Sequence, residues 1–361
     1  MRKCNPAMCF FFDSFVFSFF FHIFALMKTG ITSQRIQWID MAKGYGMIFV
    51  IIGHWNIPYI TDYLYAFHIP LFFFLSGVVY SLKKSFALFF KTKIQRIIIP
   101  YFCLGITVVF SNLLFSKGFG FGLTDVVKEA RLLVVQERYT TLWFFACLLI
   151  LNILMYPLIR YVRCRWLSDF IVFIICLCGI LLWRNGILVL PWNIDAAMVV
   201  LPFFYGGYRL KEVLISLGNI QKRHFYIIVI VTFFGILVWL LNTWNMALTG
   251  EKVDLFYSNL NIELLTFLAA TIGVAMIVLF SMSHINCIIK YIGENSILFF
   301  VWHQTIILQV LCRIYWKIGI MQSNYIEINI IKCFSVILTL VIITILNEVI
   351  IHSGLKYILG R

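Results

Sequence analysis

Charged residues are scarce in this sequence. Asp, Glu, Lys and Arg make up 12% of the 361 residues, about half the share found in soluble domains, whereas 62% of the residues are hydrophobic. A soluble domain with so few polar side chains could not cover its surface with them, and a disordered chain would be far more polar. The apolar residues form blocks of roughly 17–25, the length of a helix that crosses a bilayer. A transmembrane barrel would need alternating strands of about ten residues, and that pattern is absent. We therefore expect an all-α polytopic membrane protein.

Motifs typical of several other protein classes are also absent. The ten Cys include no C-x-x-C pair and lie mostly in or beside apolar runs, so we infer neither a disulfide framework nor a metal site. No G-x-x-x-x-G-K-[ST] phosphate loop occurs, which argues against an ATP-driven pump. No internal repeat is recognisable, which weakens the case for a secondary transporter without excluding it. We expect no bound cofactor.

The apolar blocks predict about ten membrane-spanning helices after residue 38. We place them at residues 39–58, 63–81, 97–115, 141–159, 169–184, 190–208, 225–242, 260–281, 292–311 and 329–348.

The net charge of +14 lies mostly on one set of connecting loops. If the segment before the first span is cytoplasmic, the inner side carries 18 Lys and Arg and the outer side nine. The positive-inside rule selects this orientation, with both ends of the ten-span unit in the cytoplasm. The basic inner face would attract anionic lipid head groups or a phosphate-bearing cytosolic ligand, and we expect no nucleic-acid partner. The expected location is the cell (cytoplasmic) membrane.

Residues 1–27 form a Phe-rich extension with a basic start and an apolar run that Asp13 interrupts. The extension lacks the small-residue cleavage site of a signal peptide, and as an eleventh span it would place the N-terminus outside. Met27 opens an ordinary N-terminal sequence. We hypothesise that translation starts at Met27, and a peptide from residues 4–26 in N-terminal mass spectrometry would refute this.

The first predicted span contains three ionisable residues, Asp40, Lys43 and His54. Ionisable residues inside a span are costly in lipid and are therefore functional candidates. Lys43 and His54 share one helix face, about 16 Å apart along the axis, and Asp40 lies near the same stripe. The alternative is an interfacial ion pair for Asp40 and Lys43, and an interhelical hydrogen bond for His54. A neutral imidazole is the usual proton acceptor for a hydroxyl, so we interpret His54 as a general base.

Two further imidazoles lie in predicted spans. His68 lies in the first turns of the second span together with Pro70, and Ser76 lies deeper in the same span. His303 lies in the ninth span, about 13 Å above Glu294. We predict that His68, Ser76 and His303 contribute to the site. A structural role is the alternative for each, since small residues in spans usually serve helix packing.

Two motifs stand in the first two predicted spans. Asp-x-x-Lys-Gly…Gly-His runs from Asp40 to His54, and Phe-His-x-Pro-Leu-Phe-Phe-Phe-Leu-Ser-Gly runs from Phe67 to Gly77. Weaker motifs follow in order: Arg-x-x-x-Pro at 96–100, Leu-Trp-Phe at 142–144, Pro-Phe-Phe-x-x-Gly-Tyr with one extra Gly at 202–208, and Ile-Gly-x-Asn-Ser…His at 292–303. Together they resemble the integral-membrane acyltransferase 3 family over roughly residues 35–350. The most similar branch is that of the fucose 4-O-acetylase-like sugar acetyltransferases.

The resemblance implies about ten spans and transfer of an acetyl group from cytoplasmic acetyl-CoA to a carbohydrate acceptor. That acceptor would be a sugar hydroxyl of a surface polysaccharide or a lipid-linked glycan, and residues 28–361 would form a single membrane acyltransferase domain. The family's Arg-x10-His motif corresponds to Lys43 and His54. Lys in place of Arg keeps the positive charge but loses bidentate hydrogen bonding. We therefore expect Lys43, with Asp40, to attract or orient a substrate near the catalytic base His54.

Three more residues acquire predicted roles from this reaction. Lys93 and Arg96 stand three residues apart just before the third span on the basic face, where they would attract the phosphate groups of acetyl-CoA. Trp143, at the start of the fourth span, would stack on a sugar ring. Anchoring in the headgroup region is the alternative for Trp143, since aromatic residues are enriched at membrane interfaces.

Two other functions are consistent with the same residues. A transporter or flippase of lipid-linked sugars would use the intramembrane His and Lys for proton coupling, and consumption of acetyl-CoA with thiol release distinguishes it from an acyltransferase. A membrane assembly subunit without catalysis would tolerate substitution of His54.

Overall fold

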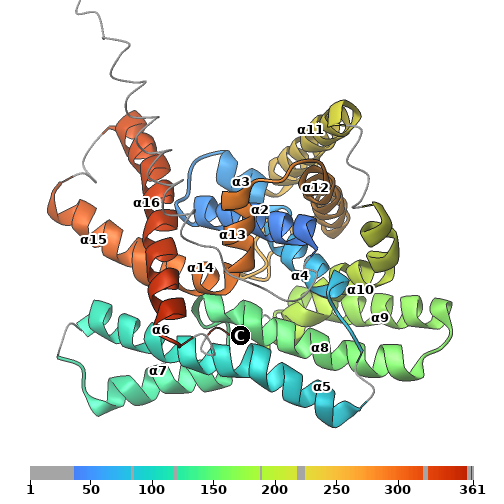
Figure 1. Cartoon of the computed structure of the whole chain (residues 1–361), viewed down its shortest axis with the longest axis horizontal. Helices are drawn as coiled ribbons and strands as arrows, with labels where there is room; N and C mark the ends of the chain where they lie inside the picture. Colours follow the sequence, from blue (N-terminus) through green and yellow to red (C-terminus); the bar gives the residue numbers. More distant parts are fainter. Residues whose placement is uncertain are drawn as a thin grey trace, which may run out of the picture. The chain divides into compact units, whose positions relative to one another are not determined.

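A computed structural model describes residues 36–82, 85–117, 120–187, 189–217, 224–319, 324–355 and 359. The hypothesis about residues 1–27 concerns a segment outside the described residues. The described part of the chain is all-helical, as the sequence predicts (Figure 1). Within it, β-structure is limited to one isolated bridge between Asp254 and Asn259.

Seven helical stretches are long and apolar enough to cross a membrane. They are Phe86–Ser116, Leu123–Tyr161, Arg165–Arg184, Tyr226–Thr249, Glu263–Ser283, Ser296–Lys317 and Tyr325–His352. These stretches coincide with seven of the ten predicted spans and indicate a multi-pass membrane protein. The other three predicted spans correspond to α2 (Gln37–His54), α4 (His68–Val78) and α10 (Ile194–Leu217). The number of ten and the cytoplasmic location of both termini stay predictions.

Three of the seven stretches, Phe86–Ser116, Leu123–Tyr161 and Ser296–Lys317, are built from several elements. In chain order the remaining elements are α3 (Ile60–Tyr65), α5 (Phe86–Lys93), η1 (Ile94–Ile98), α6 (Ile99–Lys117), α7 (Leu123–Val135), η2 (Thr140–Leu142), α8 (Trp143–Tyr161), α9 (Arg165–Arg184), η3 (Pro191–Asn193), α11 (His224–Thr249), α12 (Glu263–Ser283), α13 (Cys287–Glu294), α14 (Ser296–Trp302), η4 (His303–Leu308), α15 (Gln309–Lys317) and α16 (Tyr325–His352). The elements η1 and η4 are π-helical turns, which interrupt α-helices most often at functional sites. The turn η4 begins at His303.

The second predicted span, residues 63–81, is not one continuous helix. α3 ends at Tyr65 and α4 begins at His68, because Phe67 between them has a non-helical backbone with a φ of −142°. α4 has 11 residues and is about 16 Å long, which is short of the roughly 30 Å hydrocarbon core. Pro70 lies in its first turn, where its missing N–H leaves no intrahelical hydrogen bond unmade. This break places His68 at a helix start.

Glycines hold α4 against α10. A Cβ on Gly77 would lie 1.9 Å from the carbonyl oxygen of Phe204, and a Cβ on Gly207 would lie 2.0 Å from the carbonyl oxygen of Phe74. Only glycine at these two positions allows the backbones to approach so closely, as small residues do in other membrane helix pairs. The crossing fixes α4, and with it His68, relative to α10.

α2 and α13 cross in the same way. A Cβ on Gly44 would lie 2.0 Å from the carbonyl oxygen of Ile289, and a Cβ on Gly293 would lie 1.8 Å from that of Asp40. The Lys-Gly and Ile-Gly motifs of the sequence therefore mark two sides of one helix contact.

A cluster of Phe rings fills the space between α4, α8 and α14. Phe73 and Phe144 have ring centroids 4.7 Å apart, and Phe144 and Phe300 have centroids 4.8 Å apart. Phe72 packs edge-on against Phe144 at 6.0 Å. These buried rings form a core that supports the wall of the cavity described below, because Phe300 belongs to both.

Ion pairs between different helices join residues that the charge pattern assigns to one side of the membrane. They are Arg138–Asp195 and Arg184–Glu263, both predicted outside, and Arg209–Asp169, predicted inside. The ion pairs therefore agree with the assignment of these helix ends to two opposite faces of the membrane. Which face is cytoplasmic stays a prediction.

Candidate active site

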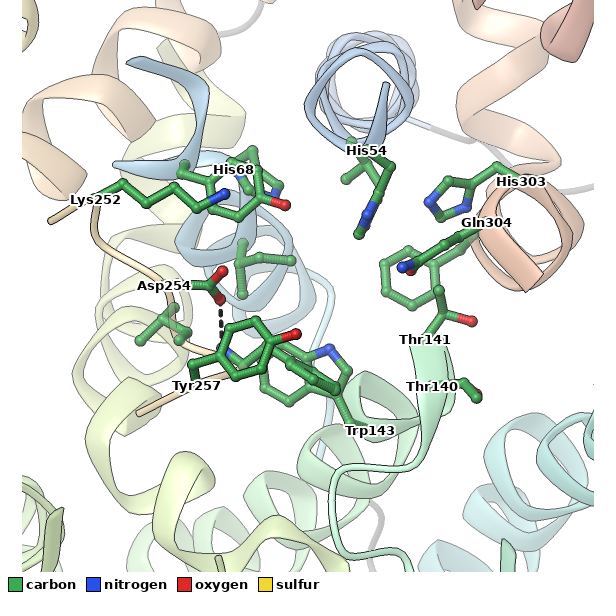
Figure 2. Close-up of a pocket in the computed structure, with 16 residues that line it drawn as sticks. His54, His68, Thr140, Thr141, Trp143, Lys252, Asp254, Tyr257, His303 and Gln304 are labelled. Carbon is green, nitrogen blue, oxygen red and sulfur yellow. Dashed lines mark hydrogen bonds between the residues drawn. The ribbon is translucent and has the colours of Figure 1, made fainter. Parts of the chain in front are cut away.

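A cavity of about 250 Å³ lies where the end of α2, the start of α4, the segment before α8, the loop between α11 and α12, and the turn η4 meet (Figure 2). Its polar lining residues are His54, Tyr65, His68, Thr140, Thr141, Trp143, Lys252, Asp254, Tyr257, His303 and Gln304. The cavity therefore gathers side chains that lie far apart in the sequence.

His54 is the last residue of α2, and its imidazole extends into the cavity (Figure 2). The helix does not continue, because Asn56 and Tyr59 have left-handed backbones with φ values of 50° and 62°. Gly53 lets α2 approach α3, since a Cβ there would lie 2.9 Å from the ring of Tyr65. The close approach of α2 to α3 therefore explains why a glycine precedes His54.

Three imidazoles predicted from separate spans line this one cavity. The ring centroids of His54 and His303 are 4.9 Å apart, with their planes inclined by 48°. His68 packs edge-on against Tyr65, also with a centroid distance of 4.9 Å. His68 and His303 are buried, whereas His54 is half-buried. Among the described residues, no group of three or more His, Cys, Asp or Glu side chains is placed to hold a metal ion.

Hydrogen bonds fix the tautomers of two of these rings. Nδ1 of His68 donates to the carbonyl oxygen of Leu64 at 2.7 Å, and Nδ1 of His303 donates to that of Phe299 at 2.8 Å. Because a carbonyl oxygen only accepts, Nδ1 carries the proton in both rings, and Nε2 of the neutral ring is an acceptor. Nε2 of His303 is buried and has no hydrogen-bond partner in the described part of the chain. The cavity therefore presents acceptor nitrogens to a bound hydroxyl.

The imidazole of His54 differs from the other two. It forms no hydrogen bond with any described residue, so its tautomer is free to follow a bound substrate. Gln304, next to His303, also lines the cavity, and its side-chain amide has no hydrogen-bond partner among the described residues. Figure 2 shows His54, His303 and Gln304 on one side of the cavity.

The loop between α11 and α12 supplies the opposite side, with Lys252, Asp254 and Tyr257 (Figure 2). Nζ of Lys252 lies 4.2 Å from the ring centroid of Tyr65. Asp254 accepts a hydrogen bond from the backbone N–H of Phe256 at 3.0 Å. Burial raises the pKa of the Asp254 carboxyl above its ordinary value, and the Phe256 N–H and the charge of Lys252 oppose this only in part.

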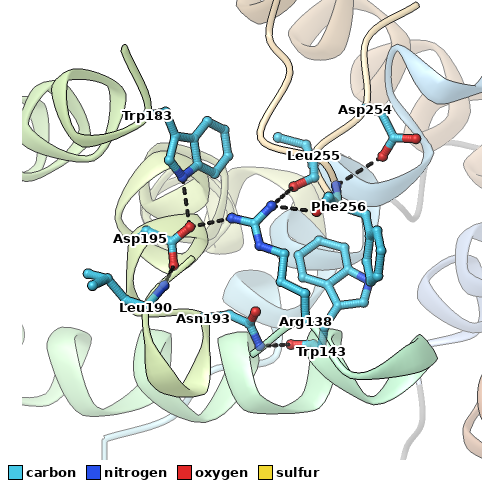
Figure 3. A network of polar contacts seen from close by, with 9 residues as sticks. All are labelled: Arg138, Trp143, Trp183, Leu190, Asn193, Asp195, Asp254, Leu255 and Phe256. Carbon is cyan, nitrogen blue, oxygen red and sulfur yellow. Dashed lines mark hydrogen bonds and ion pairs between the residues drawn. The ribbon is translucent and has the colours of Figure 1, made fainter. Parts of the chain in front are cut away.

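Arg138 holds this loop in place (Figure 3). Its Nη1 donates to the carbonyl oxygens of Leu255 at 2.9 Å and Phe256 at 2.5 Å. Its Nη2 forms a buried ion pair with Asp195 at the start of α10. Because Leu255 and Phe256 stand between Asp254 and Tyr257, the guanidinium fixes the segment that carries these two cavity residues.

The carboxylate of Asp195 has further donors. It accepts from Nε1 of Trp183 at 2.7 Å and from the backbone N–H of Leu190 at 3.0 Å. The guanidinium of Arg138 also lies 5.2 Å from the ring centroid of Trp183. Additional hydrogen bonds of this kind offset the cost of burying an ion pair. Here they satisfy both oxygens of Asp195 and two nitrogens of Arg138, while Nε of Arg138 has no hydrogen-bond partner among the described residues.

Lys43 and Asp40 do not line the cavity. They lie in the first half of α2, beside its crossing with α13, and Asp40 is buried. Eleven residues of helix separate Lys43 from His54, which corresponds to about 16 Å. α2 therefore carries polar side chains at two depths, of which His54 alone reaches the cavity.

Ser76, Lys93 and Arg96 also lie outside the cavity. The Oγ of Ser76 donates to the carbonyl oxygen one turn earlier in α4 at 2.7 Å. Nζ of Lys93 lies 5.3 Å from the ring centroids of both Tyr80 and Phe89. Arg96, in the π turn η1, is exposed.

Several polar residues of the cavity were not predicted from the sequence, among them Thr140, Thr141, Lys252, Asp254, Tyr257 and Gln304. A signal was present for the loop residues, since Lys-x-Asp-x-x-Tyr is a polar cluster in a short connection between two apolar blocks. Gln304 directly follows His303, which is one of the predicted site residues. A polar pair inside an apolar span is itself a functional signal.

Comparison with known families gives one match. The model of the acyltransferase 3 family, described as an acyltransferase domain, matches residues 36–348. The matched range includes every element that lines the cavity. No curated protein and no solved structure matches the chain.

Proposed function

The chain belongs to the acyltransferase 3 family and is a membrane acyltransferase, and we propose that it transfers an acetyl group from acetyl-CoA to a sugar hydroxyl. In this proposal the protein acts as the fucose 4-O-acetylase-like sugar acetyltransferases do. Its acceptor is a surface polysaccharide or a lipid-linked glycan, and it works in the cell (cytoplasmic) membrane.

The arrangement of imidazoles around the cavity is the observation that carries this proposal. His54 is half-buried at a helix end and makes no hydrogen bond to a described residue, whereas His68 and His303 present acceptor Nε2 atoms. O-acetyl transfer requires one base for the attacking hydroxyl and partners for the neighbouring hydroxyls of the sugar. The cavity offers both.

His54 acts as the general base in the proposed reaction. Its imidazole accepts the proton of the sugar hydroxyl while the oxygen attacks the carbonyl carbon of the thioester. The tetrahedral intermediate then collapses with cleavage of the C–S bond. The departing coenzyme A thiolate takes the proton from the imidazolium of His54, which gives an O-acetyl sugar and a free thiol.

The remaining cavity residues serve the two substrates. The amide of Gln304 lines the cavity and offers N–H donors for the oxyanion of the tetrahedral intermediate. His68 and His303 accept hydrogen bonds from the acceptor, and Trp143 and Tyr257 offer aromatic faces for the sugar ring.

The donor side of the proposal rests on charge outside the cavity. Lys93 and Arg96 attract the phosphate groups of acetyl-CoA from the basic face, and Lys43 with Asp40 orients the donor along α2. The thioester then has to reach His54, about 16 Å from Lys43 along the helix. Ser76 contributes to the acceptor end only through the packing of α4, since its hydroxyl bonds to its own helix.

The test is a direct assay of the purified full-length protein. We expect it to release thiol from acetyl-CoA only when an acceptor glycan is present, and mass spectrometry to find one added acetyl group on that glycan. Glycans from cells with and without the gene identify the acceptor to use. Movement of a lipid-linked sugar across proteoliposomes without thiol release would contradict the proposal and identify a transporter.

A further inference from the structure

A second cavity, of about 410 Å³, lies near the opposite end of α8, the helix whose first residue lines the first cavity. α8 begins at Trp143 in the first cavity, and Leu158 near its end lines the second, so about 23 Å of helix separate the two. The end of α8, the start of α9 and the second half of α10 line it. At this distance the second cavity is not part of the candidate active site.

The second cavity is strongly basic. Arg163, Arg165, Arg209 and Lys211 line it, against the single carboxylate of Glu212. The first turn of α9, a 20-residue helix, also lines the cavity, and the N-terminal end of a helix favours a bound anion. Both the side chains and the backbone therefore favour a negatively charged ligand.

Two of these cations are committed to the protein. Nη1 of Arg209 donates to Asp169 at 2.8 Å and to the hydroxyl of Tyr205 at 2.5 Å. Nζ of Lys211 donates to the carbonyl oxygen of Tyr80 at 3.2 Å. These contacts hold the inner wall of the cavity in a fixed arrangement.

Arg163 and Arg165 are different. Both are exposed, and neither forms an ion pair within the described part of the chain. Their guanidinium groups are therefore available to bind a phosphate bidentately.

The surface beside these two arginines is apolar. Tyr161 is 73% exposed, Trp166 is 84% exposed, and Phe170 is 60% exposed. Large exposed aromatic side chains next to Arg are typical of the interface between lipid headgroups and acyl chains. A soluble phosphate ligand would make no use of them, whereas a lipid would.

We propose that this cavity binds the phosphate of an anionic phospholipid. Arg163 and Arg165 hold the headgroup phosphate, Arg209 and Lys211 add positive charge behind it, and the acyl chains lie along the exposed apolar side of α9. The cavity lies on the face that the charge pattern assigns to the cytoplasm, where anionic lipids attract basic residues. The inference does not depend on the identity of the donor or the acceptor.

Native mass spectrometry of the purified full-length protein tests this proposal. The protein is equilibrated with equal amounts of phosphatidylglycerol and phosphatidylcholine in detergent, and the retained lipids are counted. We expect a preference for phosphatidylglycerol, a roughly tenfold loss of that preference in the R163A/R165A variant, and a smaller loss in R163K/R165K, which keeps the charge but not the bidentate hydrogen bonds. Both arginines are exposed, so we expect the variants to fold normally, and a melting curve of each variant verifies this.

A matched control removes two exposed cations elsewhere. K128A/R131A in α7 loses the same charge, and we expect it to keep the preference of the wild-type protein. Equal loss in K128A/R131A and R163A/R165A would overturn the proposal, as would a wild-type protein without any preference. Displacement of phosphatidylglycerol by inorganic phosphate or by acetyl-CoA would also overturn it, because the cavity would then be a site for a soluble phosphate.

Discussion

The imidazoles of His54 and His303 lie 4.9 Å apart, and only one of them has a free choice of tautomer. His303 donates its Nδ1 proton to the carbonyl oxygen of Phe299, whereas His54 has no hydrogen-bond partner among the described residues. A general base must accept a proton and later give it away, so the ring without a fixed proton is the better candidate. This difference supports the proposal that His54 is the base and that its neighbours accept hydrogen bonds from the acceptor.

Replacing the base should remove most of the activity. We expect His54→Ala to lower kcat for thiol release from acetyl-CoA by about 10²–10⁴-fold, the usual contribution of a positioned acid or base. His284→Ala is the control, because His284 is exposed and lies outside the cavity. A correctly inserted His54→Ala protein with wild-type kcat would refute the assignment.

Replacing His68 should affect binding more than chemistry. In the proposed reaction its Nε2 accepts a hydrogen bond from the acceptor in the ground state and the transition state alike. His68→Ala should therefore raise KM for the glycan by about tenfold at nearly unchanged kcat. Steady-state kinetics with varied acceptor measure this. A loss of kcat as large as that of His54→Ala would instead make His68 part of the base.

The histidines were predictable from the sequence because an ionisable residue in an apolar block is conspicuous wherever it folds. Helical periodicity also predicted that Lys43 and His54 share a face of α2. It also predicted that they lie about 16 Å apart along the axis. That His54 alone reaches a cavity depends on how α2 packs against α3 and α13. A single helix does not contain that information.

The loop that carries Lys252 and Asp254 was not predictable for a related reason. Its conformation depends on Arg138, which is more than a hundred residues away in the sequence. The break between α3 and α4 was hidden as well, because hydrophobicity continues without interruption from Tyr65 to His68. Local composition predicts helices, but the breaks and loops between them depend on contacts with residues distant in the sequence.

Arg138 should be essential for stability. Arg138→Ala leaves the buried carboxylate of Asp195 without its charged partner and frees the carbonyl oxygens of Leu255 and Phe256. We expect a loss of about 3–5 kcal/mol in the free energy of unfolding, and Arg138→Lys should recover only part of it, because an ammonium lacks the planar fork. Denaturant unfolding in detergent measures the loss.

The exposed pair Arg184–Glu263 provides the control. The side chain of Arg184 is 65% exposed, so Arg184→Ala should cost far less stability than Arg138→Ala. Replacing both buried partners, as Arg138→Leu with Asp195→Leu, should recover part of the stability that Arg138→Ala loses. If Arg138→Ala were no worse than Arg184→Ala, the loop would not depend on the buried pair.

Asp254 should make stability depend on pH. Its carboxyl has a pKa above the ordinary value of 3.8 in the folded protein, because burial disfavours the charged form. The folded protein therefore binds the proton more tightly than the unfolded chain does. The resulting stabilisation is complete below pH 3.8 and is lost as the pH rises through the raised folded pKa, by up to about 1.4 kcal/mol per pH unit.

The Asp254→Asn variant removes this titration. Its amide oxygen still accepts from the Phe256 N–H, so the loop keeps its hydrogen bond. We expect the difference in unfolding free energy between the variant and the wild-type protein to grow in favour of the variant from pH 4 to 7. If the free energies of unfolding of the two proteins changed in parallel with pH, a raised pKa for Asp254 would be ruled out.

Two adjacent glycines in α10 should respond in opposite ways to the same substitution. A Cβ on Gly207 would lie 2.0 Å from the carbonyl oxygen of Phe74, whereas a Cβ on Gly206 would have no heavy atom within 4 Å. Gly207→Ala forces α4 and α10 apart and should cost about 1–3 kcal/mol or more, since backbone atoms cannot rotate away. Gly206→Ala keeps the crossing and should gain up to about 1 kcal/mol from helix propensity.

Melting temperatures in detergent distinguish the two variants. Thiol release should fall in Gly207→Ala alone, because α4 carries His68 into the cavity. Equal destabilisation by both variants would mean that α10 itself, rather than its contact with α4, requires glycine.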